Sequence, residues 1–347
     1  MEKLEPQVKN TRWTLQFVVC LLFIYPGLSS GQQKSLFDYI SSYDSLELFV
    51  ETDFRGLLRK KDKYQPAHIH INTTNKEVID VDGEIRSRGN MRKNICYMPP
   101  TKLRFTKTYL AENKWRDYPT LKVVNCCAFN HLSETYVELE YLIYDIYNLL
   151  TDRSFNVCKT TLNYIDITGK RKPVNFDGFL IEHEDQLADR LDGEIYEGSF
   201  FKVTQLDRKA YILFSMFQFM IGNTDWKVLN KHNLEIVKVE KDRTCYPIPY
   251  DFDYSGLVHA TYAVPNESLP IKSVTDRIYL GPCQSQEEVL EMCIFFRGKK
   301  EQVFSLVDKI LSDEKENRAC KNYLEDFFAI VADEKNAKAI FMNCRDY

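Results

Sequence analysis

One stretch, residues 217–256, constrains this chain more than any other part of it. It continues an apolar run, residues 210–221, in which most positions are Tyr, Ile, Leu, Phe or Met. Such a run predicts a buried helix, and Gly222-Asn223 then ends it with residues that tolerate positive φ. Asp225 is therefore expected on a loop that leaves a rigid core element.

Polar side chains follow this loop in an ordered series. His232-Asn233 leads into residues 234–239, whose alternation of apolar and polar side chains is typical of a half-buried strand. Residues 251–256 then place two carboxylates on either side of an aromatic ring. Phosphoryl transfer requires a carboxylate that positions a hydroxyl, and carboxylate and amide oxygens that hold a divalent cation. The candidate base is Asp225, and the candidate metal ligands are Asn233, Asp251 and Asp253.

The first half of the chain shows strand patterns. Residues 46–51, 68–72 and 78–86 each alternate apolar with polar side chains. His68 and His70 would share one strand face and could ligate a metal, although an ordinary exposed face is the better interpretation. Arg88-Gly89-Asn90 marks a turn whose amides and guanidinium could meet phosphate oxygens, with a plain hairpin turn as the equal alternative.

A long helix is predicted over residues 133–150, capped by Ser133, because apolar residues recur there at i, i+3 and i+4. Glu140 falls within that mostly apolar stripe, where a carboxylate costs free energy unless it is paired. We therefore expect it to be paired.

The sequence pattern after Gly256 predicts helices. Ser285 and Glu288 form a capping box, and apolar stripes follow it to the end of the chain. With 347 residues, of which 44% are hydrophobic and 28% charged, the composition is that of a globular protein. A net charge of −4 gives no electrostatic case for binding nucleic acid.

Residues 1–31 predict a targeting segment. Basic residues precede a short apolar run, residues 15–25, and small residues follow at 29–31. We therefore expect a periplasmic or extracellular protein with no integral membrane span after signal removal; an uncleaved anchor is the alternative. Nine cysteines remain after Cys20 is removed, and this odd number cannot all pair internally.

The Asn-x-Asp…His-Asn series followed by Asp-Phe-Asp-x-Ser-Gly resembles the atypical kinases typified by spore coat protein H, the CotH-like kinases. Residues 86–90, Arg-Ser-Arg-Gly-Asn, and the strand at residues 100–105 fit the entry region of that family, so the resemblance covers residues 46–256. It implies an α+β, two-lobed atypical kinase-like fold. The β-rich N-lobe with one long helix would span residues 32–185, and the mainly helical C-lobe residues 186–347.

The resemblance also implies a function. It implies an ATP-dependent phosphotransferase that uses Mg²⁺ or Mn²⁺ and transfers the γ-phosphate to a protein Ser/Thr or to another hydroxyl of a protein or small molecule. A hinge at residues 179–183 would face adenine with its backbone. The implied nucleotide-binding residues are Lys102, Glu140, Arg88 and Glu182. In this interpretation Lys102 binds phosphate and pairs with Glu140, as the Lys–Glu pair of a kinase does, and Lys122 is the rival of Lys102.

Three alternatives stay open. Kinase-loop spacing would select Asn230 as the metal-binding amide, whereas register with the following strand favours Asn233. Trp226 stands where related sequences carry a basic or small residue, which leaves a non-catalytic kinase-fold scaffold possible. Asp251-x-Asp253 also copies the acidic pair of haloacid-dehalogenase-type phosphatases, but the two prolines within residues 245–250 disfavour the apolar strand that normally precedes that pair.

Overall fold

The computed structural model describes Met1 and residues 33–43, 45–74 and 78–343. By backbone contacts the chain divides into residues 1–33 and 34–347, and the strands, helices and cavity lie in the second unit. The expected targeting segment at residues 1–31 lies outside the described residues, Met1 excepted.

Seven strands of the first half close into a barrel, in the order β1-β2-β3-β4-β5-β7-β6. β1 pairs with β2 in antiparallel fashion and with β6 in parallel, and this second pairing closes the barrel. Alternate side chains of β1, Leu46, Leu48 and Val50, point into the buried interior. The strands are β1 (Leu46–Thr52), β2 (Gln65–Thr73), β3 (Val78–Ser87), β4 (Thr101–Arg104), β5 (Thr120–Asn125), β6 (Val157–Asp166) and β7 (Val174–Ile181).

The closed barrel shows that the expected α+β, two-lobed kinase-like fold is wrong. The chain instead combines the barrel with a helical C-terminal region. One hydrophobic core runs from Leu36 to Phe341 through both parts. Alternating side chains indicate which residues face a core, but they do not indicate which strand edges meet. The parallel contact between Glu47 and Thr161, which closes the barrel, joins residues more than a hundred positions apart and has no local signal.

The long helix α5 (His131–Leu150) packs against β6 and β7 of the barrel and against α8 (Gln286–Ile310) of the second half. It begins two residues before the predicted start, because Asn130 is the N-cap and accepts a hydrogen bond from the Ser133 N–H at 2.9 Å. The Ser133 hydroxyl instead accepts from the Cys127 and Ala128 amides. The helix thereby joins the barrel to the C-terminal helices.

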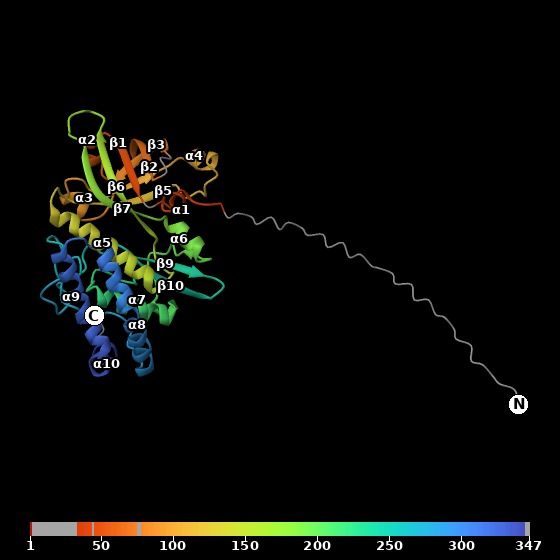
Figure 1. Cartoon of the computed structure of the whole chain (residues 1–347), viewed down its shortest axis with the longest axis vertical. Coiled ribbons are helices and arrows are strands. Elements are labelled where there is room, and N and C mark those ends of the chain that lie inside the picture. The colour runs from red at the N-terminus through yellow and green to blue at the C-terminus, as the bar shows by residue number, and fades with distance from the viewer. Residues whose placement is uncertain (2–32, 44, 75–77, 344–347) are drawn as a thin grey trace. The chain divides into compact units, whose positions relative to one another are not determined.

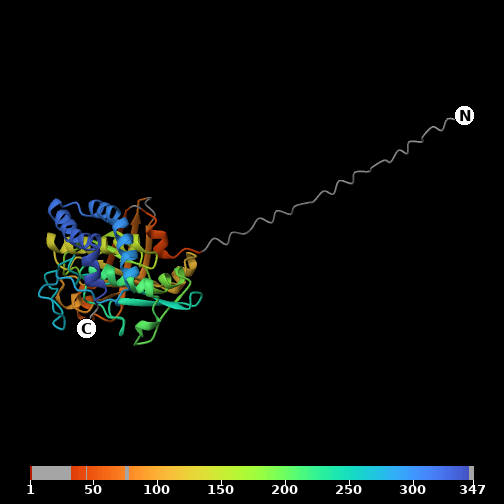
Figure 2. The ribbon, with the colours of Figure 1, turned by 90° about the horizontal axis from the view of Figure 1, so that it is seen from below.

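The second half holds a three-stranded sheet, ordered β10-β9-β8, and a group of helices. Helix α7 (Arg208–Met220) packs on β10, and Figures 1 and 2 show α8, α9 and α10 (blue) side by side. The predicted capping box of Ser285 and Glu288 starts α8 and is confirmed. The strands are β8 (Glu194–Ile195), β9 (Leu234–Val239) and β10 (Thr244–Pro249), and the further helices are α6 (Glu184–Arg190), α9 (Glu314–Ala332) and α10 (Glu334–Phe341).

The short helix α1 (Leu36–Ile40) precedes β1. Three more short helices lie between strands of the first half, α2 (Phe54–Arg59), α3 (Arg92–Ile95) and α4 (Lys107–Glu112), and a 3₁₀ turn lies at Val203–Gln205 in the second half. Across the described residues, no helix has the length and apolar character needed to cross a membrane.

Candidate functional site

A cavity of about 450 Å³ lies where the loop after β3 meets the loops around β9 and β10. This volume is in the range of small-molecule sites. The cavity brings together five of the eight residues proposed from the sequence: Arg88, Asp225, Asn233, Asp251 and Asp253. The other lining residues are Gly89, Asn90, Met91, Arg92, Asn94, Pro100, His232 and Tyr254.

Asp225 lies on the loop after α7, and two neighbours hold its carboxylate. The Asn233 side-chain amide donates to Oδ2 at 2.9 Å, and His232 Nε2 lies 2.8 Å from Oδ1. The Asp225 N–H in turn donates to the Asn223 side-chain oxygen at 3.0 Å. The side chain is 38% exposed. The carboxylate is thus fixed in orientation and still accessible from the cavity, and His232 is a contact that the sequence analysis did not assign.

Asn233 uses its amide nitrogen entirely on Asp225, since Nδ2 also donates to the Asp225 carbonyl at 2.8 Å. Its Oδ1 makes no hydrogen bond within the described part of the chain, so this oxygen could ligate a cation. The residue has a positive φ of 54°, which asparagine tolerates better than most residues. Asn230, the alternative amide, does not line the cavity.

Asp251 directly follows β10 and also has a positive φ, 63°. Its N–H donates to the Tyr144 hydroxyl at 3.1 Å. Its carboxylate makes no hydrogen bond or ion pair with any residue that the structure describes. A non-glycine residue at positive φ is uncommon, and such backbone positions concentrate at functional sites. Asp251 therefore presents an uncommitted anionic group to the cavity.

Asp253, two residues further on, is fully engaged at one oxygen. Its Oδ2 accepts from Arg92 Nε at 3.0 Å and from the Tyr262 hydroxyl at 3.1 Å. Arg92 Nη2 also donates to Glu140 Oε2 at 2.5 Å. The three charged side chains are 9% (Asp253), 8% (Arg92) and 2% (Glu140) exposed. They form a buried network that joins α3, α5 and the loop after β10.

The charged groups of this network, together with their burial, shift one another's pKa values. Burial alone would lower the pKa of Arg92, but Glu140 and Asp253 raise it well above its usual value, so the guanidinium stays cationic. Burial raises the pKa of Glu140 above its usual 4.5, although Arg92 opposes the shift. Burial likewise raises the pKa of Asp253 against the opposing effect of Arg92.

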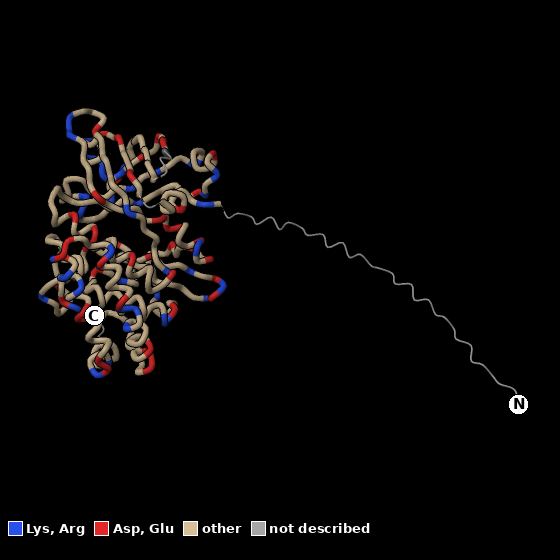
Figure 3. The backbone as a smooth tube through the Cα atoms, in the orientation of Figure 1, with Lys and Arg blue, Asp and Glu red and all other residues tan. Residues whose placement is uncertain are grey.

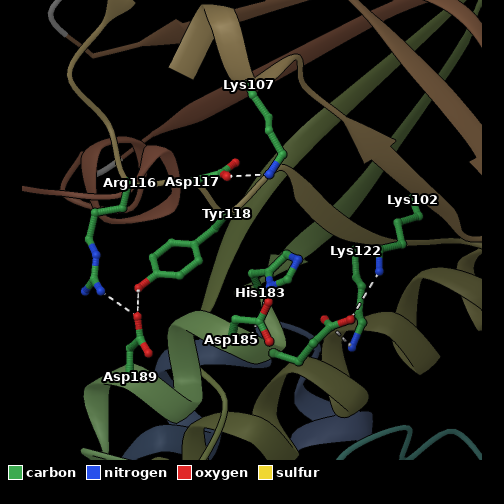
Figure 4. A network of polar contacts seen from close by, with 10 residues as sticks. Lys102, Lys107, Arg116, Asp117, Tyr118, Lys122, His183, Asp185 and Asp189 are labelled. Atoms are coloured by element: carbon green, nitrogen blue, oxygen red, sulfur yellow. Dashed lines mark hydrogen bonds and ion pairs between the residues drawn. The ribbon is translucent and has the colours of Figure 1, made fainter. Parts of the chain in front are cut away.

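The expected pair of Lys102 with Glu140 is not formed, because Arg92 occupies that place. Lys102 on β4 and its cross-strand neighbour Lys122 on β5 both contact Glu184, at 3.3 and 3.2 Å. Figure 4 shows the two lysines pointing to one carboxylate at the start of α6. Lys122 also lies 5.3 Å from the ring centroids of Phe155 and Tyr250. Neither Lys102 nor Lys122 is therefore the partner of Glu140, because both pair with Glu184, which lies outside the cavity lining.

The other end of α6 is held by a second polar group in Figure 4. Asp189 accepts from the Tyr118 hydroxyl at 2.6 Å and from Arg116 at 2.5 Å. Helix α6 is thus fixed to the barrel at both ends.

Glu182, expected at an adenine-facing hinge, is fully buried at the end of β7. Its carboxylate accepts from the Asn156 N–H at 2.7 Å and from Arg190 at 2.6 Å. Its own N–H donates to the Asn156 carbonyl at 3.1 Å. The carboxylate and the backbone N–H of Glu182 therefore both make contacts that join the chain before β6 to the chain after β7.

Arg88 lies on the loop after β3, beside Gly89, whose φ is 81°. Its N–H donates to the Pro100 carbonyl at 2.8 Å, which fixes the backbone. Its guanidinium has no hydrogen-bond or ion-pair partner among residues 33–43, 45–74 and 78–343. An unpaired arginine in a cavity is suited to bidentate binding of a phosphate group.

A disulfide fastens the loop that carries Arg88 and Arg92. Cys96, at the end of α3, is bonded to Cys127 in the turn before α5, and the Tyr97 N–H donates to the Cys127 carbonyl at 2.9 Å. Five other described cysteines are free and buried: Cys126, Cys158, Cys245, Cys293 and Cys320.

The donors around the cavity fit a hard divalent cation. Asp251 and the Asn233 Oδ1 supply oxygen ligands that have no hydrogen-bond partner among the described residues, and such oxygens suit Mg²⁺ or Mn²⁺. Among the described residues, no three His, Cys, Asp or Glu side chains lie close enough together to enclose a metal. Mg²⁺ commonly binds through one or two carboxylates, with phosphates and water completing its coordination.

In chemical terms, the cavity combines an oriented carboxylate, oxygen ligands for a cation and an arginine for an anion. Neither the protein-family models nor the curated proteins include a match to this chain.

Proposed function

We propose that this protein is a metal-dependent phosphotransferase that transfers the γ-phosphate of ATP to a hydroxyl group. One observation carries the proposal: a carboxylate held by two neighbours, Asp225, shares a cavity with Asp251 and Arg88, whose charged groups have no partner in the part of the chain that the structure describes. A structural polar cluster would pair its charges internally, because a charge left without a partner costs free energy on burial. Groups left free around a cavity are the ones available to a ligand.

Each residue then has a role. Asp251 and Asn233 Oδ1 hold Mg²⁺ or Mn²⁺, which when bound neutralises phosphate charge. Arg88 binds phosphate oxygens. Asp225 orients the acceptor hydroxyl and accepts its proton, while His232 and Asn233 hold the carboxylate in place. Arg92 fixes Asp253 through Oδ2, which leaves Oδ1 for the cation or its water shell.

One observation favours a second candidate, a protein that binds nucleotide without transferring phosphate. Both carboxylate oxygens of Asp225 already have a hydrogen-bonding neighbour, so an acceptor hydroxyl must share an oxygen with His232 or Asn233. A non-catalytic binding protein needs only Arg88 and the cation ligands.

Both candidates bind nucleotide, and only the phosphotransferase transfers phosphate, so the transfer assay separates them. Binding of Mn-ATP and Mg-ATP is measured by calorimetry, and transfer from labelled ATP is measured with a Ser/Thr/Tyr peptide library as acceptor. We expect Asp225→Asn to retain nucleotide binding and to lose transfer by roughly 10²–10⁴-fold. Asp117→Asn, which alters an exposed ion pair with Lys107 outside the cavity, is the matched control and should transfer normally.

Binding without transfer in the unaltered protein would select the non-catalytic candidate. If neither Mn-ATP nor Mg-ATP binds at millimolar concentration, both candidates are wrong.

A further inference from the structure

Basic residues concentrate on one surface of the barrel, which we call the basic face and define as residues 53–63, 91–97 and 167–172. These three segments carry ten Lys and Arg residues against two Asp residues, a net charge of +8, in a chain whose net charge is −4. One of the ten, Arg92, is buried in the network with Glu140. The remaining chain is therefore strongly acidic, and the positive charge is local.

Contacts between the segments show that they form one surface. The Lys61 Nζ donates to Asn94 Oδ1 at 2.9 Å, and Lys93 pairs with Asp62 at 2.9 Å, which joins the residues after α2 to α3. The turn between β6 and β7 contacts the chain next to α2 and the chain next to α3. The Ile167 N–H donates to the Thr52 carbonyl at 3.1 Å, next to α2, and the Arg171 guanidinium lies 5.9 Å from the Tyr97 ring. Figure 1 shows α2 beside this turn.

Large apolar side chains are exposed on the same face. Ile167 is 63% exposed, Ile95 48%, Met91 46% and Tyr97 45%. Phe129, 57% exposed, lies beside the face with its ring 4.9 Å from that of Tyr97. Scattered apolar residues on a surface need no explanation, but a group of them around a basic cluster marks an interaction site.

The turn between β6 and β7 protrudes and is the most basic part of the face. Lys170, Arg171 and Lys172 are consecutive and exposed, and none has an ion-pair partner in the described part of the chain. Gly169, with a φ of 65°, makes the turn. Figure 3 shows the blue positions at its tip.

We propose that the basic face binds an anionic phospholipid bilayer. Peripheral proteins bind such bilayers by placing lysine and arginine among the headgroups while neighbouring apolar side chains enter the acyl boundary. Here Ile167 lies three residues from Lys170 on a protruding turn, and Met91 and Ile95 flank Lys93 on α3. An acidic protein partner would need the positive charge but not apolar side chains interleaved with it.

Bilayer binding through the basic face does not require the proposed phosphotransferase activity, but it would affect which acceptors that activity can reach. Met91, Arg92 and Asn94 belong both to the basic face and to the lining of the cavity. A protein bound through this face would therefore hold the cavity beside the bilayer surface, where a membrane-associated acceptor could reach it.

The test is co-sedimentation of the whole protein with vesicles of phosphatidylcholine alone or with 30% phosphatidylglycerol. We expect binding to the anionic vesicles, and loss of that binding at about 0.5 M NaCl because salt screens surface charge. The double variant Lys170→Glu/Lys172→Glu should bind at least about tenfold more weakly. Ile167→Ser, which keeps every charge, should also bind more weakly.

The matched control is Lys315→Glu/Lys335→Glu, which reverses two exposed lysines on α9 and α10 and should leave vesicle binding unchanged. Equal binding to neutral and anionic vesicles would overturn the proposal. So would unchanged binding of the Lys170→Glu/Lys172→Glu variant. Binding to poly-glutamate with no binding to vesicles would also overturn it and would show that the face takes an acidic polypeptide.

Discussion

Two regions of this protein place one basic side chain between two carboxylates, and they differ in burial and in the base itself, since Arg92 is always charged whereas His68 is charged only when protonated. In the site, Arg92 lies between Glu140, at 2.5 Å, and Asp253, at 3.0 Å. On the barrel surface, His68 of β2 lies between Asp80, at 2.6 Å, and Asp82, at 2.9 Å, both of β3. The three buried side chains are at most 9% exposed, whereas the three surface side chains are 41–96% exposed.

Burial determines what each arrangement contributes. Water and salt screen an exposed pair, so such pairs contribute little to stability. A buried pair has lost its hydration, and removal of one partner leaves an uncompensated charge. We infer that the Arg92 network fixes the loops around the cavity, while the His68 cluster has little influence on the fold. Four predictions test this contrast, from the largest expected effect to the smallest.

The largest effect is expected for Arg92→Met, which leaves Glu140 and Asp253 buried without a cation. The free energy of unfolding should fall by about 3–5 kcal/mol, measured by urea denaturation. Arg277→Met is the matched control, because Arg277 is 11% exposed and donates to the Met220 and Tyr323 carbonyls. That control leaves two neutral carbonyls and the carboxylate of Asp326, which lies 3.9 Å from Arg277 but is 75% exposed and stays hydrated, so the loss should be about 1–3 kcal/mol.

The double variant Arg92→Met/Glu140→Gln adds a second test of the same network. Replacing the buried Glu140 carboxylate by a neutral amide should restore part of the stability lost in Arg92→Met, so the two effects should not add. Strict additivity, or equal losses in Arg92→Met and Arg277→Met, would show that the buried network is no different from an ordinary buried arginine.

The second prediction compares Asp251, which lies outside the Arg92 network, with Asp253, which lies within it. Asp251→Asn should leave the free energy of unfolding within about 0.5 kcal/mol of the original, because this carboxylate has no partner among the described residues. It should weaken Mn-ATP binding by roughly 10–100-fold, measured by calorimetry. Asp253→Asn should lower both quantities, since an amide cannot compensate Arg92. Equal effects of the two variants on stability would contradict this division.

The division between committed and free groups also shows what the sequence could predict. Asp225, Asn233, Asp251 and Arg88 were proposed from local patterns, since each lies next to a turn or at the end of a strand or helix, and all four line one cavity. Asp225, Asn233 and Asp251 come from elements that are adjacent in the chain, whereas Arg88 follows β3, more than a hundred positions earlier, and only the fold brings it to them.

The partner of Glu140 could not be found in the same way. Periodicity showed that this carboxylate is buried and must be paired, which is correct. It did not show which cation pairs with it, because Arg92 lies 48 positions away on a four-residue helix without a periodic pattern. Lys102 matched the expected chemistry, but its strand register directs it to Glu184. The closed barrel could not be predicted for the same reason, because β1 and β6 pair through residues that are distant in sequence.

The third prediction concerns Glu184, which is 27% exposed and so lies between the two extremes. Burial alone would raise its pKa, but Lys122 and Lys102 together lower the pKa below the usual 4.5. Its contribution to stability is therefore fully present above about pH 4.5 and is lost as the pH falls through the lower folded-state value. Glu184→Gln should cost about 2 kcal/mol at pH 7. That deficit should shrink below pH 4.5, measured by urea denaturation across pH, and it should be absent in the exposed control Glu267→Gln.

The smallest effect is expected at His68. Its hydrogen bond to Asp82, supported by the charge of Asp80, raises its pKa above 6.5. The cluster's contribution is therefore present below about pH 6.5 and is lost as the pH rises through the raised folded-state value. Because the cluster is exposed, His68→Ala should cost less than about 1 kcal/mol at pH 5.5, and 1 M NaCl should remove most of that difference. His70→Ala is the control, since His70 lies on the same strand face and packs edge-on against Phe49 at 5.5 Å. Its effect arises from packing and should not respond to salt. A loss at His68 as large as that of Arg92→Met would mean that burial does not distinguish the two arrangements.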